Sequence, residues 1–293
     1  MTRRLALLVN PASGRGRFAG AVDAVADRLA SGGFQVTRMV GGDAAESAGF
    51  AGSAVADGYD ALVLMGGDGL VHLALQHVVA SGTVLGVIGT GTGNDVSRAL
   101  GIPARAPLEA VEVVLAGETR KMDVGSAGGT YFATVLAAGF DSLVAERANA
   151  MTWPAGQMRY NLATLAELRV FRPIGYTLEL DGQQRRREAM LVAVGNCPSY
   201  GGGIRICHGA EIDDGLLDVV VIKPVSKLEL VKVYPRLFKG THVSHPAYEL
   251  HRVRSVTVDA PSVVAYADGE RLAPLPVTVE VVPGAVTVFA PGP

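Results

Sequence analysis

The sequence predicts a mixed α/β domain followed by a β-rich domain. Residues 4–125 alternate short apolar runs with amphipathic segments, which is typical of a parallel sheet with helices on both faces. From residue 173 onward, strand-like segments are separated by Gly, Pro and Asp turns, which is typical of an antiparallel sandwich. The 293 residues, 49% of them hydrophobic, are sufficient for two cores and favour two domains, 1–125 and 126–293.

The elements of the first domain follow from its apolar pattern. Predicted strands are the apolar runs 4–10, 34–40, 60–67 and 84–89. Predicted helices are the amphipathic segments 18–31, 44–57, 70–79, 95–100 and 107–116. The ligand site of such a sheet lies at the carboxyl ends of its strands, so we expect the loops that follow the strands to bind the ligand.

The second domain is predicted from alternation of apolar and polar residues. Its strands are the segments 173–182, 187–196, 217–222, 255–260, 277–282 and 286–291, and the last residues belong either here or back in the first domain. Segment 145–170 is amphipathic, and its Met, Trp and Tyr side chains either pack between helices or line a lipid entrance. We favour packing.

Charge and composition exclude several classes of protein. The net charge is −2, with 26 basic and 28 acidic residues, and nucleic-acid-binding motifs are absent, so we expect no nucleic-acid partner. No apolar run approaches the length of roughly 18 residues that a membrane span needs, and we expect no strongly basic amphipathic helix. Cys197 and Cys207 lack metal-ligand spacing, and the amino terminus lacks a signal-peptide core, which favours the cytoplasm.

Three strand-end loops have unusual chemistry: NPASGRG at 10–16, GGDGL at 66–70 and GTGTGND at 89–95. Glycines let the backbone approach a bulky anion, and the N–H groups that begin the next helix can bind phosphate oxygens. Any one of these loops is explained as a tight turn, but three on one edge of the sheet predict a polyphosphate site. None matches the P-loop or dinucleotide-binding pattern.

Two carboxylates stand among these glycines. Asp68 and Asp95 would repel a phosphate unless a cation lay between them, which is the role of Mg²⁺ in ATP sites. Asp95 also has a structural interpretation as a helix N-cap, and Asp68 one as a turn residue.

The chain resembles the diacylglycerol kinase catalytic-domain family, which includes bacterial lipid kinases and sphingosine kinases. The resemblance rests on six motifs in the family's order and covers nearly the whole chain. NPASG, GGDG and GTGND are similar to its nucleotide loops. The blocks FATVLAAGFDSLV (132–144), VGNCPSYGGGIRICHGAEIDDGLLDVVVI (194–222) and YADGE (266–270) are similar to those of its second domain.

The resemblance implies ATP-dependent phosphorylation of a lipid hydroxyl, with diacylglycerol as the expected substrate and phosphatidic acid as the product. It implies a phosphofructokinase/NAD kinase-like α/β nucleotide-binding domain, a C-terminal antiparallel β-sandwich domain and an active site in the cleft between them. It also implies a cytoplasmic protein that is transiently at the inner face of the membrane through peripheral contact, and it admits a homodimer.

Site residues are implied by the same resemblance. The proton acceptor falls on Glu270, with Asp268 beside it and Asp68 acting on ATP through Mg²⁺ and water. The metal site falls on Glu211, Asp214 and the Leu216 carbonyl. The nucleotide contacts fall on Asn10, Pro11, Ala12, Ser13, Gly14, Gly66, Gly67, Asp68, Gly69, Thr92, Asn94 and Asp95.

Other interpretations stay open. The same chemistry on a sphingoid base or phosphatidylglycerol fits the motifs, and NAD kinase shares the GGDG loop although not the later blocks. The family usually has a Thr and an Asn-Glu pair where this chain has Leu70, His72 and Leu73. This loss of polar groups favours the alternative of a catalytically weakened lipid- or nucleotide-binding protein.

Overall fold

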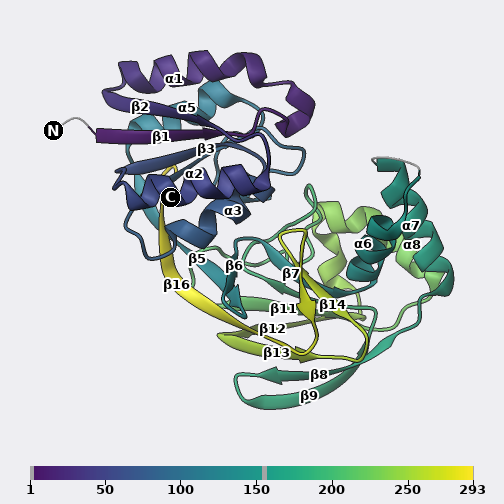
Figure 1. The fold of residues 1–293 in the computed structure, drawn as a ribbon. Helices are drawn as coiled ribbons and strands as arrows, with labels where there is room; N and C mark the ends of the chain where they lie inside the picture. Colours follow the sequence, from purple (N-terminus) through teal and green to yellow (C-terminus); the bar gives the residue numbers. More distant parts are fainter. Residues whose placement is uncertain (1–2, 154–156, 293) are drawn as a thin grey trace.

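A parallel sheet forms the centre of the first region (Figure 1). The computed structural model describes residues 3–153 and 157–292. In it, the first four strands pair in parallel in the order β2-β1-β3-β4, as the alternating pattern predicted. These strands are β1 (Arg3–Val9), β2 (Phe34–Val40), β3 (Ala61–Gly66) and β4 (Val84–Gly89).

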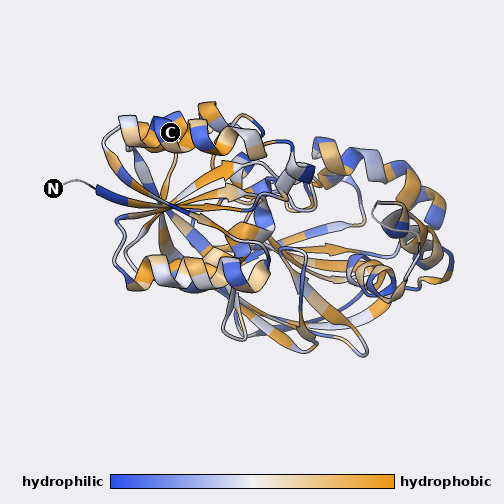
Figure 2. Cartoon of the chain, turned by 45° about the horizontal axis from the view of Figure 1, so that its top comes forward, coloured by the Kyte–Doolittle hydropathy of each residue, from blue (hydrophilic) through white to orange (hydrophobic). Residues whose placement is uncertain are grey.

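Helices cover both faces of this sheet, and Figure 2 shows its largely hydrophobic strands between two helical layers. Two helices begin elsewhere than predicted. Short 3-10 turns delay the start of the first helix to Val22, and the extended backbone of Gly67 lets α3 begin at Asp68. The helical elements are η1 (Ser13–Gly16), η2 (Ala19–Ala21), α1 (Val22–Ser31), α2 (Ala44–Ala56), α3 (Asp68–Val78), α4 (Asp95–Ala99) and α5 (Pro107–Ala116).

The second region is an antiparallel sandwich. One layer has the order β12-β11-β10-β7-β14-β15. The other continues the first sheet through β16, β13, β8 and β9, with β5 beside β16 and β6 beside β5. Buried aliphatic side chains of both layers form one core. Its strands are β5 (Thr119–Ala127), β6 (Thr130–Phe132), β7 (Val135–Gly139), β8 (Ile174–Leu180), β9 (Gln183–Ala189), β10 (Leu191–Gly195), β11 (Leu217–Ile222), β12 (Tyr248–Val253), β13 (Ser255–Asp259), β14 (Val264–Ala267), β15 (Glu270–Pro274) and β16 (Val277–Phe289).

Strand β16 joins the two regions. The sequence predicted two strands here, but they form one strand with an irregularity between Val282 and Val286. Figure 1 shows β16 running from the second region into the first. Its first half pairs with β13, and Val288 pairs in parallel with Leu85 of β4. The last residues therefore return to the first sheet. The predicted fold class, an α/β region followed by an antiparallel sandwich, is confirmed.

Three helices lie against the outer face of the second sheet: α6 (Phe140–Ala150), α7 (Gln157–Val170) and α8 (Lys227–Lys239), which η3 (Thr241–Ser244) follows. The sequence analysis expected no strongly basic amphipathic helix, but α8 has four basic residues against one acid and a row of exposed apolar side chains. The packing interpretation of segment 145–170 is wrong for Trp153 and Met158, which are 79% and 62% exposed. Residues 154–156 and the Tyr160 side chain lie outside what the structure describes.

Candidate active site

The first glycine loop folds against the third. Asn10 accepts a hydrogen bond from the Ala12 N–H through its side-chain oxygen (3.0 Å), which tightens the turn. Gly14 has φ +60°, and a Cβ there would lie 2.3 Å from the Thr90 carbonyl oxygen, so only glycine fits. Thr90 also donates to the Ser13 hydroxyl (3.1 Å). Pro11 and Ser13 line a small recess at this edge of the sheet.

The second and third loops meet at their glycines. A Cβ on Gly91 would lie 2.6 Å from the Gly67 Cα, so the two backbones touch. Asn94, in the left-handed region (φ +59°), closes the third loop by bonding both the N–H (2.7 Å) and the carbonyl (2.9 Å) of Gly91. The Thr92 carbonyl accepts from Arg105 (2.5 Å). The three turns thus lie at one edge, as the sequence predicted. Asp68 lies between Gly67 and Gly69, and Gly66 ends β3.

Asp68 begins α3 and faces the third loop. Its Oδ1 accepts a hydrogen bond from the Val96 N–H (3.1 Å). Burial raises the pKa of its carboxyl, the N–H groups of Val96 and Asp95 oppose this rise, and the charges of Asp95 and Asp268 add to it. A carboxylate held among other acids gains from a bound cation.

Asp95 connects the third loop to the second region. Its Oδ1 accepts from the Ser199 hydroxyl (2.7 Å) and Arg98 (2.8 Å), and its Oδ2 accepts from the Gly202 N–H (2.8 Å). The N-cap interpretation is wrong, because Asn94 precedes the helix and Asp95 is its first residue. Both oxygens are occupied, so the geometry favours a positioning role for Asp95.

Asp268 is anchored equally firmly. It accepts hydrogen bonds from the N–H groups of Ala133 (3.0 Å) and Thr134 (2.8 Å) and from the Thr134 hydroxyl (2.6 Å). His72 Nδ1 makes a fourth contact, 3.1 Å from Oδ2. Asp268 itself has φ +52°, a left-handed conformation that turns the chain toward Glu270. These contacts fix the position of the loop that carries Glu270.

His72 is a site residue that the sequence analysis took for a lost polar group. Burial lowers the pKa of the imidazole, but the hydrogen bond to Asp268 and the charges of Asp268 and Glu270 outweigh burial, so the pKa lies above its ordinary value. The available signal was spacing, since Asp68 and His72 stand four residues apart on α3 and share one helix face.

Glu270 differs from its neighbours. It is exposed at the start of β15, and within the described residues its carboxylate accepts no hydrogen bond. Its charge nevertheless reaches His72. Glu270 is therefore an acid that is free to meet a substrate beside a cluster of fixed acids.

The predicted metal ligands lie in the turn before β11. Asp214 accepts from the Leu216 N–H (3.0 Å) and pairs with Arg252, which also donates to Asp218 (3.0 Å). Glu211 is exposed. Within the described ranges no three acidic, His or Cys side chains form a metal-binding group. This turn does not fit a metal centre as it stands, because the arginine already neutralises Asp214.

Asp123, which the sequence analysis missed, joins this turn to β16. It accepts from the N–H groups of Gly215 and Gly284, both at 2.6 Å, and it is buried. Nothing local in the sequence singles it out, because both donors are distant along the chain.

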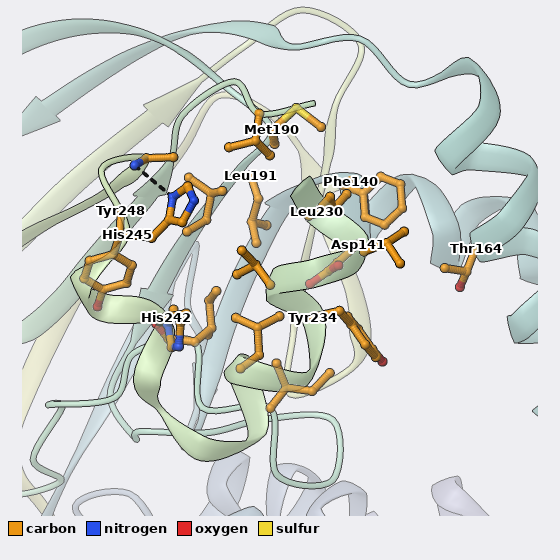
Figure 3. A pocket seen from close by; sticks show the side chains of 18 of the residues that line it. Phe140, Asp141, Thr164, Met190, Leu191, Leu230, Tyr234, His242, His245 and Tyr248 are labelled. Carbon is orange, nitrogen blue, oxygen red and sulfur yellow. Dashed lines mark hydrogen bonds between the residues drawn. The ribbon is translucent and has the colours of Figure 1, made fainter. Parts of the chain in front are cut away.

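A cavity of about 300 Å³ lies between the second sheet and the helices α6, α7 and α8 (Figure 3). Its wall is almost entirely apolar. Asp141, at the start of α6, faces it, and burial raises the pKa of that carboxyl to about 6. The lining residues include Phe140, Leu165, Met190, Leu191, Tyr200, Ile204, Ile206, Ile222, Leu230, Val231, Tyr234, Leu237 and Tyr248.

Residues 199–204 join the cavity to the glycine edge. Ser199 and Gly202 bind the Asp95 carboxylate, while Tyr200 and Ile204 line the cavity. An apolar molecule in the cavity and an anion at the glycine loops would therefore lie on opposite sides of one short loop.

Comparison with known proteins identifies the family. Residues 4–127 match the diacylglycerol kinase catalytic domain, and residues 134–290 match the YegS C-terminal NAD kinase beta sandwich-like domain. The chain is 40% identical over 294 residues to a diacylglycerol kinase of Mycobacterium tuberculosis strain H37Rv, covering 98% of this chain and 95% of the relative. It is 28% identical to the diacylglycerol kinase of Bacillus subtilis, covering 83% and 81%.

A solved structure agrees in fold. The crystal structure of a putative diacylglycerol kinase from Bacillus anthracis matches with a TM-score of 0.83 at 22% identity, over 99% of this chain and 95% of that one. The sequence had predicted this family from six motifs, and the prediction is confirmed. The chain belongs to the diacylglycerol kinase catalytic-domain family.

Proposed function

We propose that this protein is an ATP-dependent lipid kinase that transfers the γ-phosphate of ATP to the hydroxyl of diacylglycerol and so forms phosphatidic acid. The observation that carries the proposal is the short loop 199–204, which separates an acidic, glycine-rich edge from a cavity of about 300 Å³ with an apolar wall. The relatives that share nearly the whole chain are diacylglycerol kinases. Residues 1–125 then bind the nucleotide and residues 126–293 the lipid.

The nucleotide binds at the three glycine loops. Gly14 packs against Thr90, and Gly67 packs against Gly91. Because these glycines have no side chains, phosphates could lie close to the backbone at this edge of the sheet. The N–H groups at the start of α3 and the partial positive charge of its N-terminus favour an anion there. Asn10 to Gly14, Gly66 to Gly69, Thr92 and Asn94 are the residues that we assign to ATP.

Mg²⁺ fits at Asp68. Burial and neighbouring acids raise the pKa of this carboxyl despite the opposing N–H groups of Val96 and Asp95, so a bound cation would stabilise its charged form. A bound Mg²⁺ would neutralise charge on the ATP phosphates. The assignment of Glu211, Asp214 and Leu216 as metal ligands stays a prediction, and we derive no step from it.

Glu270 takes the proton from the lipid hydroxyl. Phosphoryl transfer needs an aligned hydroxyl and a base more than covalent chemistry from the protein. Glu270 is exposed and unoccupied by hydrogen bonds within the described chain, whereas Asp268 has four partners. Asp268 therefore holds the loop in place, and Glu270 accepts the proton.

The substrate requires contact with a bilayer. Among the described residues, no helix is long and apolar enough to cross a membrane. We therefore propose reversible, peripheral contact at the inner face of the membrane by a cytoplasmic protein. A homodimer stays a prediction.

A panel of lipids with labelled ATP and Mg²⁺ tests the function. We expect labelled phosphatidic acid from diacylglycerol, and less product from a sphingoid base or phosphatidylglycerol. Preference for one of those lipids would change the substrate and keep the chemistry. ATP binding with no labelled lipid from any member would favour the weakened binding protein.

A further inference from the structure

Helix α8 has an apolar side that the rest of the chain does not cover. The whole helix lies in the described part of the chain, yet it buries none of its thirteen residues. Leu228, Val231, Tyr234 and Phe238 form a stripe at successive turns and are 45–66% exposed. Tyr234 and Phe238 contact each other edge to face, with ring centroids 5.6 Å apart. An amphipathic helix normally buries such a side against its own protein.

Helix α7 presents a second exposed stripe next to α8. Met158, Leu162 and Leu165 are spaced by four and three residues and are 40–63% exposed. The two helices meet where Lys227 donates to the Arg169 carbonyl. Leu165 from α7 lines the apolar cavity, and so does Tyr234 from α8 (Figure 3). Both stripes therefore reach the wall of the cavity.

The charges on α8 indicate what covers the stripes. The helix has Lys227, Lys232, Arg236 and Lys239 against one acid, Glu229, although the whole chain is slightly acidic. Within the described residues, Lys232 and Lys239 form no ion pair. An apolar side bordered by basic residues is typical of a helix that lies in the interface of an anionic membrane.

A second copy of the chain is a poorer partner for this surface. Two copies joined through α8 would bring two helices with the same excess of positive charge together, which is unfavourable. The cavity rim would also be closed by protein, which would block entry of a lipid.

We propose that the α7–α8 surface, formed by the stripes on residues 158–165 and 228–238, docks on an anionic bilayer with the cavity rim facing the lipid. This inference rests on the proposed function, since a lipid kinase must take its substrate from a bilayer. Docking would let a lipid pass from the membrane into the cavity without crossing water.

Two double variants test the docking, and both avoid the cavity lining and the acids of the site. Leu228→Ser with Phe238→Ser removes apolar area, and Lys232→Glu with Lys239→Glu reverses charge. Leu108→Ser, at a side chain 51% exposed on α5, is the matched control. Sedimentation with vesicles of phosphatidylglycerol and phosphatidylcholine measures binding.

We expect the Lys232/Lys239 variant to bind these vesicles at least about tenfold more weakly than the parent, because two basic side chains beside the anionic surface become acidic. The Leu228/Phe238 variant should also bind at least about tenfold more weakly, because it loses the apolar area that would enter the membrane interface. Leu108→Ser should bind like the parent, and salt or pure phosphatidylcholine should weaken binding by the parent. Parental binding by both double variants would overturn the proposal. So would a parent that forms a dimer which the Leu228/Phe238 variant abolishes.

Activity on a water-soluble, short-chain diacylglycerol separates this inference from the proposed function. Both double variants should phosphorylate it like the parent, because the acids are untouched. A parent that phosphorylates no lipid, but whose vesicle binding depends on the four residues, would refute the kinase and leave the docking surface. A parent that is active, with variants that bind vesicles as it does, would refute the docking surface alone.

Discussion

The two ends of strand β7 lie beside carboxyl groups with opposite surroundings. Beside its first residue, Val135, lies Asp268, which accepts four hydrogen bonds. Just beyond its last residue, Gly139, lies Asp141, which accepts none from the described residues and faces an apolar cavity. Donors stabilise the charged form of an acid, whereas burial without donors favours the neutral form. The acidic edge around Asp268 therefore stabilises charged groups, whereas the cavity beside Asp141 favours neutral, apolar ones.

Of the predicted effects, the largest is the loss of activity when the proposed base, Glu270, is replaced. Glu270→Gln keeps the size of the side chain but cannot take a proton, and general-base catalysis contributes about 10²- to 10⁴-fold. We expect kcat toward lipid to fall by that range while the melting temperature and ATP affinity stay parental, because Glu270 is exposed. Initial rates with labelled ATP measure the effect.

Glu280→Gln, at another exposed glutamate on β16, is the control for Glu270→Gln and should be silent. If Glu270→Gln retained activity within a few-fold of the parent across pH 6 to 9, the base would have to be another acid at this edge.

Asp68→Asn tests the cation at the same edge. The amide cannot hold Mg²⁺ as a carboxylate does, and removal of one electrostatic group of this kind costs about 2 to 4 kcal/mol in the transition state. We expect kcat/KM to fall by a factor of about 30 to 10³. The folded variant should also lose the increase in melting temperature that Mg²⁺ with ATP gives the parent. Near-normal turnover by Asp68→Asn would remove Asp68 from the site.

The acidic edge was more predictable from the sequence than the cavity was. Gly67, Asp68 and Asn94 stand at strand ends, and local apolar periodicity is enough to find such positions. The links from Asp95 to Ser199 and from His72 to Asp268 span 104 and 196 residues, and no local pattern encodes them.

The cavity was missed for the same reason. Its wall combines one face of a sheet with three helices. Helix α8 was not predicted, because it is one helical segment among many strand-like ones in the second half of the sequence. Asp141 lies inside the FATVLAAGFDSLV block, but the sequence assigns it no functional role. Only the fold surrounds its carboxyl with apolar side chains.

Asp141→Asn tests the cavity by its effect on stability. The pKa of Asp141 in the folded protein is about 6, above the ordinary 3.8. The free energy of unfolding of the parent therefore falls as pH rises from 3.8 through 6. Asparagine has no charge to bury. We expect the variant to be more stable than the parent at pH 8 by at most about 3 kcal/mol, because one pKa unit corresponds to about 1.4 kcal/mol.

Denaturant unfolding at several pH values measures this difference, which should vanish well below pH 3.8, where Asp141 is neutral in both the folded and the unfolded parent. Asp259→Asn, at an exposed acid that ends β13, should show no such trend. An Asp141→Asn variant that is less stable than the parent at pH 8 would mean that the carboxylate has a partner in solution.

His72 gives the smallest effect and sharpens the comparison, because it shows whether the charge on Asp268 is used. The pKa of His72 is raised above its ordinary 6.5, so its charged form adds stability that is full below pH 6.5 and is lost as pH rises through the folded value. Glutamine retains a donor for Asp268 but carries no charge. We expect His72→Gln to be less stable than the parent by about 1 kcal/mol at pH 5.5, and the difference to shrink toward pH 9. His77→Gln on the same helix, at a histidine that forms no ion pair within the described chain, is the control. A stability difference that stayed constant from pH 5.5 to 9 would show that His72 contributes through its shape and not through its charge. A charged imidazole would then not be needed to hold the Asp268 carboxylate in place.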